Sequence, residues 1–331
     1  MSDDGNGYLG IDVGGTTIKY GVCKGDGTIV SRQSIPTEAL MDPESVIRHG
    51  LEFADAALIR SKSKITKLAA VGLAVPGVLD TTSWCLREVV NLSHWTNRPL
   101  REILNDETQL PSAVINDANA AALAEHQHRR LHQQSLALIT LGTGIGCGLA
   151  IGDQELTGDH GCAGEIGHLT IDFSTNAPMC NCGQRGHLEA YAGAPAVIER
   201  AKEAFNSCAP NSIPSEFREN HFDPLSLATA AEEGYSEPRR VILETATYLG
   251  QAIGILGQVI DPEVVLLGGA MTFGGKDSEI GQSFLNAVRM VVKNTTLQQI
   301  GGQMKIDYAS LGNTAGIIGA ALVAKQKGRE S

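Results

Sequence analysis

Apolar segments and glycine turns alternate at the start of the chain. The first apolar segment ends at Asp12, and two further segments with strand character span residues 18–23 and 28–33. A Gly-Gly pair and a Gly-Asp-Gly turn separate these three segments, and such turns between apolar segments are typical of β-hairpins. We therefore expect the chain to begin with three antiparallel strands.

The segments that follow alternate between strand and helix character. Residues 43–60 have helical character, whereas residues 68–75 are almost continuously apolar, as in a parallel strand buried on both faces. A short helix at 100–104, a strand at 112–115 and a helix at 118–130 are expected next. This order of elements predicts an α/β fold.

The second half of the chain begins in the same way as the first. Residues 136–151 comprise a strand, a glycine turn and another strand, and a long helix (241–259), an apolar strand (264–267) and a final helix (314–325) come later. Two halves that open alike indicate a duplicated α/β unit, and a cleft between two such halves is the natural place for an active site.

Length and composition agree with two soluble domains. The chain has 331 residues, more than one hydrophobic core usually organises. Its hydrophobic fraction of 42% and its mean hydropathy near zero are those of an ordinary water-soluble protein. Many of the 38 glycines cluster in short loops, which suits close approach of the backbone to a ligand.

Charge and cysteine content restrict the possible partners. The formal net charge is −11, and neither a Lys/Arg-rich stretch nor an apolar run of membrane-spanning length stands out, so we expect no nucleic-acid or membrane partner. The polar, acidic N-terminal residues do not resemble a secretory signal, so a cytoplasmic location is expected. Seven cysteines are an odd number, and disulfides are not expected in that compartment.

The first motif is Asp12-Val-Gly-Gly-Thr-Thr-Ile-Lys19. Backbone N–H groups of the turn at Gly14 and Gly15 can point at a phosphate, and the hydroxyls of Thr16 and Thr17 can add hydrogen bonds. Asp12 can orient a hydrated Mg²⁺. Lys19 closes the motif, and an ordinary Gly-Gly hairpin turn is the alternative interpretation.

Two further glycine turns follow buried strands. Gly142, Thr143, Gly144 and Gly146 form a turn that precedes another strand rather than a helix, which argues against a dinucleotide-binding fingerprint. Two hairpin loops, one in each half, would instead hold the phosphates of ATP from both sides. A third turn, Gly268-Gly269, suits a nucleoside. Each turn alone is weak support, whereas three in this order strongly favour a nucleotide site.

Asn116-Asp117 stands where a predicted parallel strand ends and a helix begins. This edge of an α/β sheet usually faces the ligand, and a carboxylate there can accept a hydroxyl proton during phosphoryl transfer. The alternative is that Asp117 is only the N-cap of an alanine-rich helix.

A segment rich in glycine, cysteine and histidine follows the second turn. His168, Cys180, Cys182 and His187 offer the two nitrogens and two sulfurs that tetrahedral zinc prefers, although their spacing is not that of a zinc finger. A glycine-rich loop with solvated histidines is the alternative. Glu165 and Glu189 flank the segment and could accept hydrogen bonds from sugar hydroxyls, but single surface glutamates are common.

These motifs together resemble the ROK family of sugar kinases and related transcriptional repressors. The resemblance runs along nearly the whole chain. Its motifs are Asp12-Val-Gly-Gly-Thr-Thr-Ile-Lys19, Val75-Pro-Gly77, Asn91-Leu-Ser-His-Trp95, Asn116-Asp-Ala-Asn119, Leu141-Gly-Thr-Gly-Ile-Gly146, Gly164-Glu-Ile-Gly-His168, the CxCGxxG segment that begins at Cys180, and Asp261-Pro-Glu-Val-Val-Leu-Leu-Gly-Gly269.

The resemblance implies a fold, a reaction and roles for particular residues. It implies two ribonuclease-H-like, actin-like ATPase domains with the active site in the cleft between them, one formed by residues 1–116 and 315–331 and the other, with the zinc loop, by 117–314. It also implies that the chain forms a homodimer. Asp117 is then the catalytic base. The residues that would contact the sugar are Asn91, Asn116, Asp117, Glu165, His168 and Glu189.

The zinc ligands implied by the resemblance include one departure from the family pattern. His187 stands where the family usually has a third cysteine, and we expect the zinc site to survive as His168, Cys180, Cys182 and His187 because histidine is a good zinc ligand. His168 would then give one ring nitrogen to zinc and the other to a sugar hydroxyl.

The predicted reaction is transfer of a phosphoryl group from MgATP to the 6-hydroxyl of a hexose, with glucose favoured. Fructose, mannose, allose and N-acetylated amino sugars stay open as substrates, and polyphosphate stays open as a donor. Repressors of the family carry a helix-turn-helix domain ahead of the first phosphate loop. Few residues precede Asp12 and the chain is acidic, so we expect a kinase rather than a sugar-sensing repressor.

Overall fold

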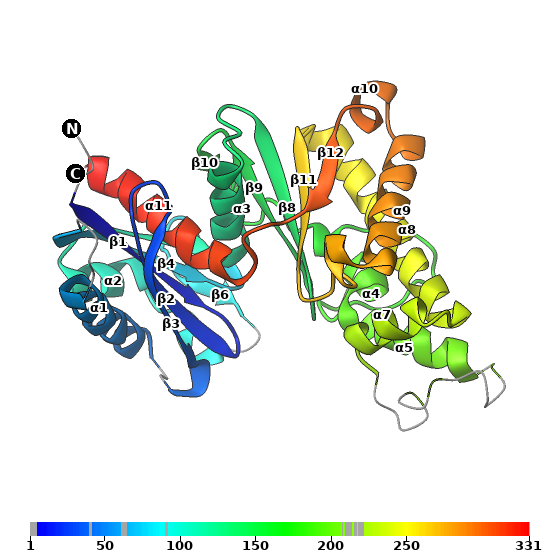
Figure 1. The fold of residues 1–331 in the computed structure, drawn as a ribbon, viewed down its shortest axis with the longest axis horizontal. Helices are drawn as coiled ribbons and strands as arrows, with labels where there is room; N and C mark the ends of the chain where they lie inside the picture. Colours follow the sequence, from blue (N-terminus) through cyan, green and yellow to red (C-terminus); the bar gives the residue numbers. More distant parts are fainter. Residues whose placement is uncertain are drawn as a thin grey trace. The chain divides into compact units, whose positions relative to one another are not determined.

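A computed structural model describes residues 5–39, 42–60, 65–89, 92–206, 208, 214, 217 and 222–330 (Figure 1). The chain divides into two compact units. The first contains residues 1–134, 148–164 and 310–331, and the second contains residues 135–147 and 165–309. Within the described residues, no helix is both long and apolar enough to cross a membrane.

The first sheet has five strands in the order β3-β2-β1-β4-β7. β1 pairs antiparallel with β2 and parallel with β4, and β7 is parallel to β4. The three antiparallel strands and the buried parallel strand expected from the sequence are therefore confirmed. The bounds are β1 (Asn6–Val13), β2 (Thr17–Cys23), β3 (Ile29–Pro36), β4 (Lys67–Val75) and β7 (Ser112–Asn116).

Helices cover both faces of the first sheet (Figure 1). Side chains of β1 alternate between the faces. Leu9 and Ile11 belong to the core that includes Val46 and Ile47 of α1 (Pro43–Arg60), whereas Tyr8 packs in a second cluster with residues of α11. The helices on that second side are α3 (Asp117–His128) and α11 (Ala315–Glu330).

Glycines let the backbone of α11 lie directly against the sheet and against α3. A Cβ atom added at Gly10 of β1 would lie 1.9 Å from the carbonyl oxygen of Ile317, and one added at Gly319 would lie 1.8 Å from that of Ala120. Neither distance leaves room for a methyl group. This close packing holds two segments against α11: the end of β1, which contains Asp12, and the start of α3, which contains Asp117.

Further short elements complete the first unit. α2 (Leu100–Thr108) is longer than the helix expected at 100–104, and it ends where Gln109 adopts a left-handed conformation with φ of 52°. The remaining bounds are η1 (Thr37–Ala39), β5 (Val78–Leu79), β6 (Leu86–Glu88), η2 (Ser93–Trp95), β10 (Gln154–Glu155) and η6 (Gly312–Thr314).

The second sheet has the order β10-β9-β8-β11-β12, which repeats the chain order of the first sheet. β11 is parallel to both β8 and β12, and β10 is antiparallel to β9. The duplication expected from the sequence is therefore confirmed. The bounds are β8 (Ser135–Leu141), β9 (Ile145–Ile151), β11 (Val264–Gly269) and β12 (Lys305–Tyr308).

The second unit also contains several helices. α8 extends over 25 residues and packs closely on α9, because Gly250 leaves only 2.7 Å between an added Cβ atom and Cβ of Val291. Of these helices the sequence analysis expected only the one at 241–259. The bounds are η3 (Ile166–His168), α4 (Glu189–Ala192), α5 (Ala194–Asn206), α7 (Pro224–Glu232), α8 (Ser236–Ile260), η5 (Gly275–Asp277), α9 (Glu279–Thr295) and α10 (Gln298–Gly301).

The compact units divide the chain differently from the expected domains. Residues 117–134 and 148–164 belong to the first unit, although the sequence analysis assigned them to the domain formed by 117–314. The physical reason is the packing of α3 on α11 at Gly319, described above, which ties the helix after Asp117 to the first unit.

Candidate active site

The carboxyl ends of the strands in the first sheet bring three expected site residues to one edge: Asp12, Asn116 and Asp117. In the register of the sheet Asp12 lies beside Ala74, and Val75 lies beside Asn116. The side-chain amide of Asn116 donates to the carbonyl oxygen of Gly77 at 3.0 Å, which ties the end of β7 to the turn after β4. This is the edge at which α/β sheets bind ligands.

Asn116, not Asp117, is the N-cap of α3. Its Oδ1 accepts hydrogen bonds from the backbone N–H groups of Ala118 at 2.9 Å and Asn119 at 3.1 Å. Asp117 is the first residue of the helix. The interpretation of Asp117 as a plain cap is therefore wrong, because its neighbour performs that function.

The pKa of Asp117 is raised to about 7. Burial is the largest cause, since it disfavours the charged carboxylate, and the negative charge of Asp12 adds to it. The backbone N–H of Ala118 and the charge of Lys19 act in the opposite direction. A carboxylate with a pKa near neutral pH is well matched to accept and release a proton.

Asp12 faces the first turn of α11 and is paired with a lysine. A Cβ atom added at Gly316 would lie 2.5 Å from Cγ of Asp12, so only glycine leaves space for this carboxylate. Nζ of Lys19 lies 3.0 Å from Oδ2 of Asp12, and the two side chains are largely shielded from solvent. Asp12 is thus held in place where a cation could bind.

The first glycine turn is braced by a residue that the sequence analysis did not single out. The backbone N–H of Gly14 donates to the carbonyl oxygen of Thr17 at 3.0 Å, which closes the turn. Thr37 donates its hydroxyl to the carbonyl oxygen of Gly14 at 2.7 Å and its N–H to that of Thr16 at 3.0 Å. Only the pairing of β2 with β3 brings Thr37 here, so no local motif could have identified it.

A cavity of about 550 Å³ opens beside this turn in the first unit. Thr16, Thr17 and Lys19 line it together with Arg32 of β3 and Asn313 of η6. Hydroxyls, an amide and two cations around one space are suited to binding phosphate oxygens.

In the second unit, Glu189 holds the second glycine turn. Its Oε2 accepts the backbone N–H of Ile145 at 2.9 Å, and a Cβ atom added at Gly144 would lie 2.6 Å from that oxygen. Gly269, with φ of 91°, places its Cα against Leu141, since an added Cβ atom would lie 2.3 Å from the carbonyl oxygen of Leu141. The turns Gly142–Gly146 and Gly268–Gly269 therefore lie side by side at the carboxyl ends of β8 and β11.

The four residues expected to bind zinc lie together in the second unit. Sγ of Cys180 is 3.8 Å from Nδ1 of His168, and Sγ of Cys182 is 3.2 Å from Nδ1 of His187. All four ligand atoms lie within 4.8 Å of one another. Bonds of the usual lengths to zinc would place ligand atoms about 3.3–3.8 Å apart in a tetrahedron, so this donor set fits the metal.

Backbone contacts and burial support the histidine and cysteine ligands. Thr170 and His187 form an isolated antiparallel bridge, which sets the two histidine rings 5.5 Å apart. Burial, followed by the charge of His168, lowers the pKa of His187, so its ring stays neutral, the form that binds metal. Cys180 is 3% exposed.

The remaining sugar-contacting residues are placed only in part. Oε2 of Glu165 lies 4.0 Å from Nε2 of His168, on the side of the ring opposite the cysteine. The two side chains are about equally exposed. Asn91 lies outside the described residues.

Comparison with known proteins places this fold and these motifs in one family. The family model of the ROK family matches residues 8–327. The chain belongs to the ROK family.

Relatives and solved structures match over nearly the full length. A glucokinase of Halalkalibacterium halodurans is 32% identical over 322 residues, which are 97% of this chain and 95% of the relative. The crystal structure of a ROK hexokinase from Thermus thermophilus matches with a TM-score of 0.78 and 31% identity, over 98% of this chain and 100% of that chain. That of a ROK glucokinase from Streptomyces griseus, in complex with glucose and AMPPNP, matches with a TM-score of 0.73 and 28% identity, over 97% and 99%.

The names of other relatives show that the family is functionally diverse. An N-acetylmannosamine kinase of Escherichia coli is 30% identical over 96% of this chain and 98% of its own length. A xylose repressor of Caldicellulosiruptor bescii is 27% identical over 96% of this chain and 78% of its own length. Similarity to these proteins therefore gives the family and the two-domain actin-like fold, and not one sugar.

Proposed function

We propose that this protein is an ATP-dependent sugar kinase that phosphorylates the 6-hydroxyl of a hexose, with glucose as the favoured substrate. The observation that carries the proposal is Asp117, a half-buried carboxylate with a pKa of about 7 at the ligand-binding edge of the first sheet. A side chain in that position is suited to accept the proton of a sugar hydroxyl. The relatives named glucokinase support glucose over the other hexoses.

In the proposed reaction the 6-oxygen of the sugar attacks the γ-phosphorus of ATP. The bond from that phosphorus to the bridging oxygen breaks, ADP leaves, and the hydroxyl proton passes to the carboxylate of Asp117. Most of the acceleration in phosphoryl transfer comes from positioning and charge stabilisation rather than from the base alone.

The residues proposed to bind the sugar are Asn116, Asp117, Glu165, His168 and Glu189. Asn91 is included from the family motif. Glu189 would have two tasks, because one of its oxygens already holds the glycine turn through Ile145.

The nucleotide would be held by the three glycine turns and by the groups around them. The turn at Gly14, Gly15, Thr16 and Thr17 supplies N–H groups and hydroxyls for phosphates, and Asp12 would orient hydrated Mg²⁺. Backbone N–H groups of Gly142–Gly146 would bind phosphates as well, and Gly268-Gly269 leaves room for the nucleoside.

Zinc would be a structural ion at His168, Cys180, Cys182 and His187. When bound it would supply rigidity to the loop that carries His168. That histidine would coordinate through Nδ1 and keep Nε2, 4.0 Å from Glu165, for a sugar hydroxyl. We also expect a homodimer in the cytoplasm.

A panel of sugars at fixed ATP concentration, followed by ADP release, tests the proposal. The panel includes glucose, mannose, fructose, allose, N-acetylglucosamine and N-acetylmannosamine, each repeated with polyphosphate as donor. The highest kcat/KM should be with glucose and ATP. Release of ADP with none of these sugars, together with specific DNA binding in a gel shift, would replace the kinase by the repressor.

A further inference from the structure

The side chain of Glu125 is buried in the first unit, and the proposed reaction does not use it. Glu125 belongs to α3, the helix that begins at Asp117, and its side chain has 0% exposed surface. Burial of a carboxylate is costly unless hydrogen bonds and opposite charges compensate it. The donors that surround Glu125 therefore indicate which part of the chain it holds in place.

Three of these donors come from two consecutive residues that are distant in the sequence. Oε1 of Glu125 accepts the backbone N–H groups of Ser310 at 2.5 Å and of Leu311 at 2.6 Å, and Oε2 accepts the hydroxyl of Ser310 at 2.9 Å. Nε of Arg129 donates to Oε2 at 3.3 Å. Hydrogen bonds to a carboxylate are stronger than those between neutral groups. Glu125 therefore holds the segment between β12 and α11 against α3 (Figure 1).

The segment that Glu125 holds continues into η6, which lines the cavity beside the first glycine turn. The carbonyl oxygen of Leu311 accepts the backbone N–H of Thr314 at 3.2 Å and its hydroxyl at 2.7 Å. Leu311 is thus bonded to Glu125 through its N–H and to Thr314 through its carbonyl oxygen. Asn313 and Thr314 line the cavity of about 550 Å³ together with Thr16, Thr17 and Lys19.

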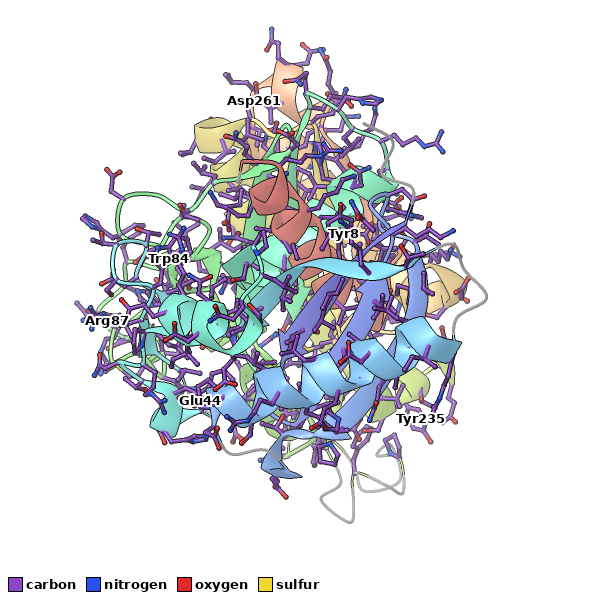
Figure 2. The ribbon with its side chains drawn as sticks, turned by 90° about the vertical axis from the view of Figure 1, so that its left-hand side faces the viewer. Tyr8, Glu44, Trp84, Arg87, Tyr235 and Asp261 are labelled. Carbon is purple, nitrogen blue, oxygen red and sulfur yellow. The ribbon has the colours of Figure 1, made fainter. Side chains whose placement is uncertain are left out.

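Apolar packing alone does not fix the orientation of η6. Leu311 packs against the cluster that contains Tyr8 of β1, which is labelled in Figure 2. Gly312 and Asn313 are exposed, and Gly312 has a φ of 51°. Hydrophobic contact is not directional, whereas hydrogen bonds have a preferred geometry. The hydrogen bonds to Glu125 therefore orient the start of η6.

We propose that Glu125 is a positioning residue for nucleotide binding, because it holds Asn313 beside the first glycine turn through Leu311. This inference rests on the proposed kinase function. The side-chain amide of Asn313 donates to a phosphate oxygen of the nucleotide. Without the carboxylate of Glu125, η6 adopts the binding arrangement in only a fraction of the molecules, and the apparent affinity for nucleotide falls by that fraction.

Calorimetric titration of the full chain with ADP and Mg²⁺ tests the proposal. Glu125→Gln replaces one accepting oxygen by an NH₂ group, which faces the donors of residues 310 and 311. We expect its Kd for ADP to rise at least about five-fold. KM for ATP should rise similarly, whereas kcat at saturating ATP and KM for the sugar should stay within about two-fold of wild type. Glu52→Gln, at an exposed position of α1, is the matched control and should bind ADP as the wild type does.

A double-mutant cycle tests whether Glu125 acts through Asn313. Asn313→Ala should also raise the Kd for ADP about five-fold. In the double variant, Glu125→Gln should add less than about a further two-fold, because the amide that it positions is already absent. A residue that only stabilises the fold would instead give effects that multiply.

The outcomes separate this inference from the proposed function. If the wild-type protein binds no ADP, the kinase function and the inference fail together. If the wild type binds ADP and Glu125→Gln binds it equally well, or if the effects of the two substitutions multiply, the inference alone is overturned. Thermal unfolding shows whether Glu125→Gln folds. If it does not, Ser310→Ala decides, since it removes one of the three contacts and should raise the Kd at least about two-fold; an unchanged Kd would overturn the inference.

Discussion

The carboxylate of Asp12 lies close enough to Asp117 to raise the pKa of Asp117. The two residues come from the ends of β1 and β7, and the glycine contacts of α11 hold both ends in place. Burial is the largest cause of the raised pKa of Asp117, and the nearby negative charge of Asp12 adds to it, so that Asp117 exchanges its proton near pH 7. In the proposed kinase, Asp12 would orient the Mg²⁺ that accompanies the phosphates of the donor, and Asp117 would be the base.

The rate of the reaction should depend on the ionisation of Asp117. Below its pKa of about 7 the carboxyl group is protonated and cannot accept the hydroxyl proton. We therefore expect kcat/KM for the sugar to rise with pH and to reach half its maximum near pH 7, since kcat/KM reports the pKa of the free enzyme. Removing the neighbouring charge in Asp12→Asn should shift this midpoint to lower pH. A profile that is flat between about pH 5.5 and 8 would contradict the assignment.

Zinc removal should destabilise the second unit. Four ligand atoms within 4.8 Å of one another are suited to the proposed zinc site, and structural zinc contributes to folding free energy. Elemental analysis should find about one zinc per chain, and Cys180→Ser should lower both zinc content and Tm. Cys208→Ser, which changes a cysteine outside the group, is the matched control. Absence of zinc together with an unchanged Tm in Cys180→Ser would exclude the site.

Substitution of Glu189 should separate its two proposed tasks. Glu189→Gln keeps an oxygen that can accept the N–H of Ile145 but removes the negative charge, so KM for the sugar should rise while KM for ATP changes little. Glu189→Ala leaves that N–H without an acceptor and should raise both KM values. The loss of one such hydrogen bond corresponds to about 1–3 kcal/mol, or roughly ten-fold or more. Equal effects of the two variants on ATP binding would show that the turn does not depend on this oxygen.

The close packing of α11 predicts different effects at two of its glycines. Gly319→Ala places Cβ 1.8 Å from the carbonyl oxygen of Ala120, so it should destabilise the protein by about 3 kcal/mol or more, or prevent folding. Gly328→Ala meets nothing closer than 3.7 Å and should be neutral or stabilising by up to about 1 kcal/mol. Denaturant unfolding measures both. Similar stability of the two variants would contradict the packing described for α11.

The sequence predicted the fold well where hydrophobic patterns are long or glycine turns are distinctive. The hairpins, the strand at 68–75 and the duplicated order of strands were all confirmed. Helices α5, α7 and α9 were not anticipated, although α9 has a clear apolar face with Ile280, Phe284 and Val288 buried. The attachment of α3 to the first unit rests on a contact between Gly319 and Ala120, far apart in the chain, which no local pattern contains.

The candidate site was predictable where residue type and motif carry the chemistry. The cysteines and histidines of the proposed zinc site do lie together, as their donor atoms suggested. Which of Asn116 and Asp117 is the N-cap of α3 could not be predicted from the sequence, because either residue type can cap a helix. The bracing of Gly14 by Thr37, and of Ile145 by Glu189, depends on strand pairing and on turns between distant segments.

The turnover of Asp117→Asn with glucose and ATP tests the central proposal most directly. Asparagine has nearly the same shape but cannot accept the hydroxyl proton. We predict that kcat falls by about 10²–10⁴-fold, the usual contribution of a general base, while the Kd for glucose measured by calorimetry stays within about three-fold of wild type. A kcat close to that of the wild-type protein would contradict the assignment of Asp117 as the catalytic base.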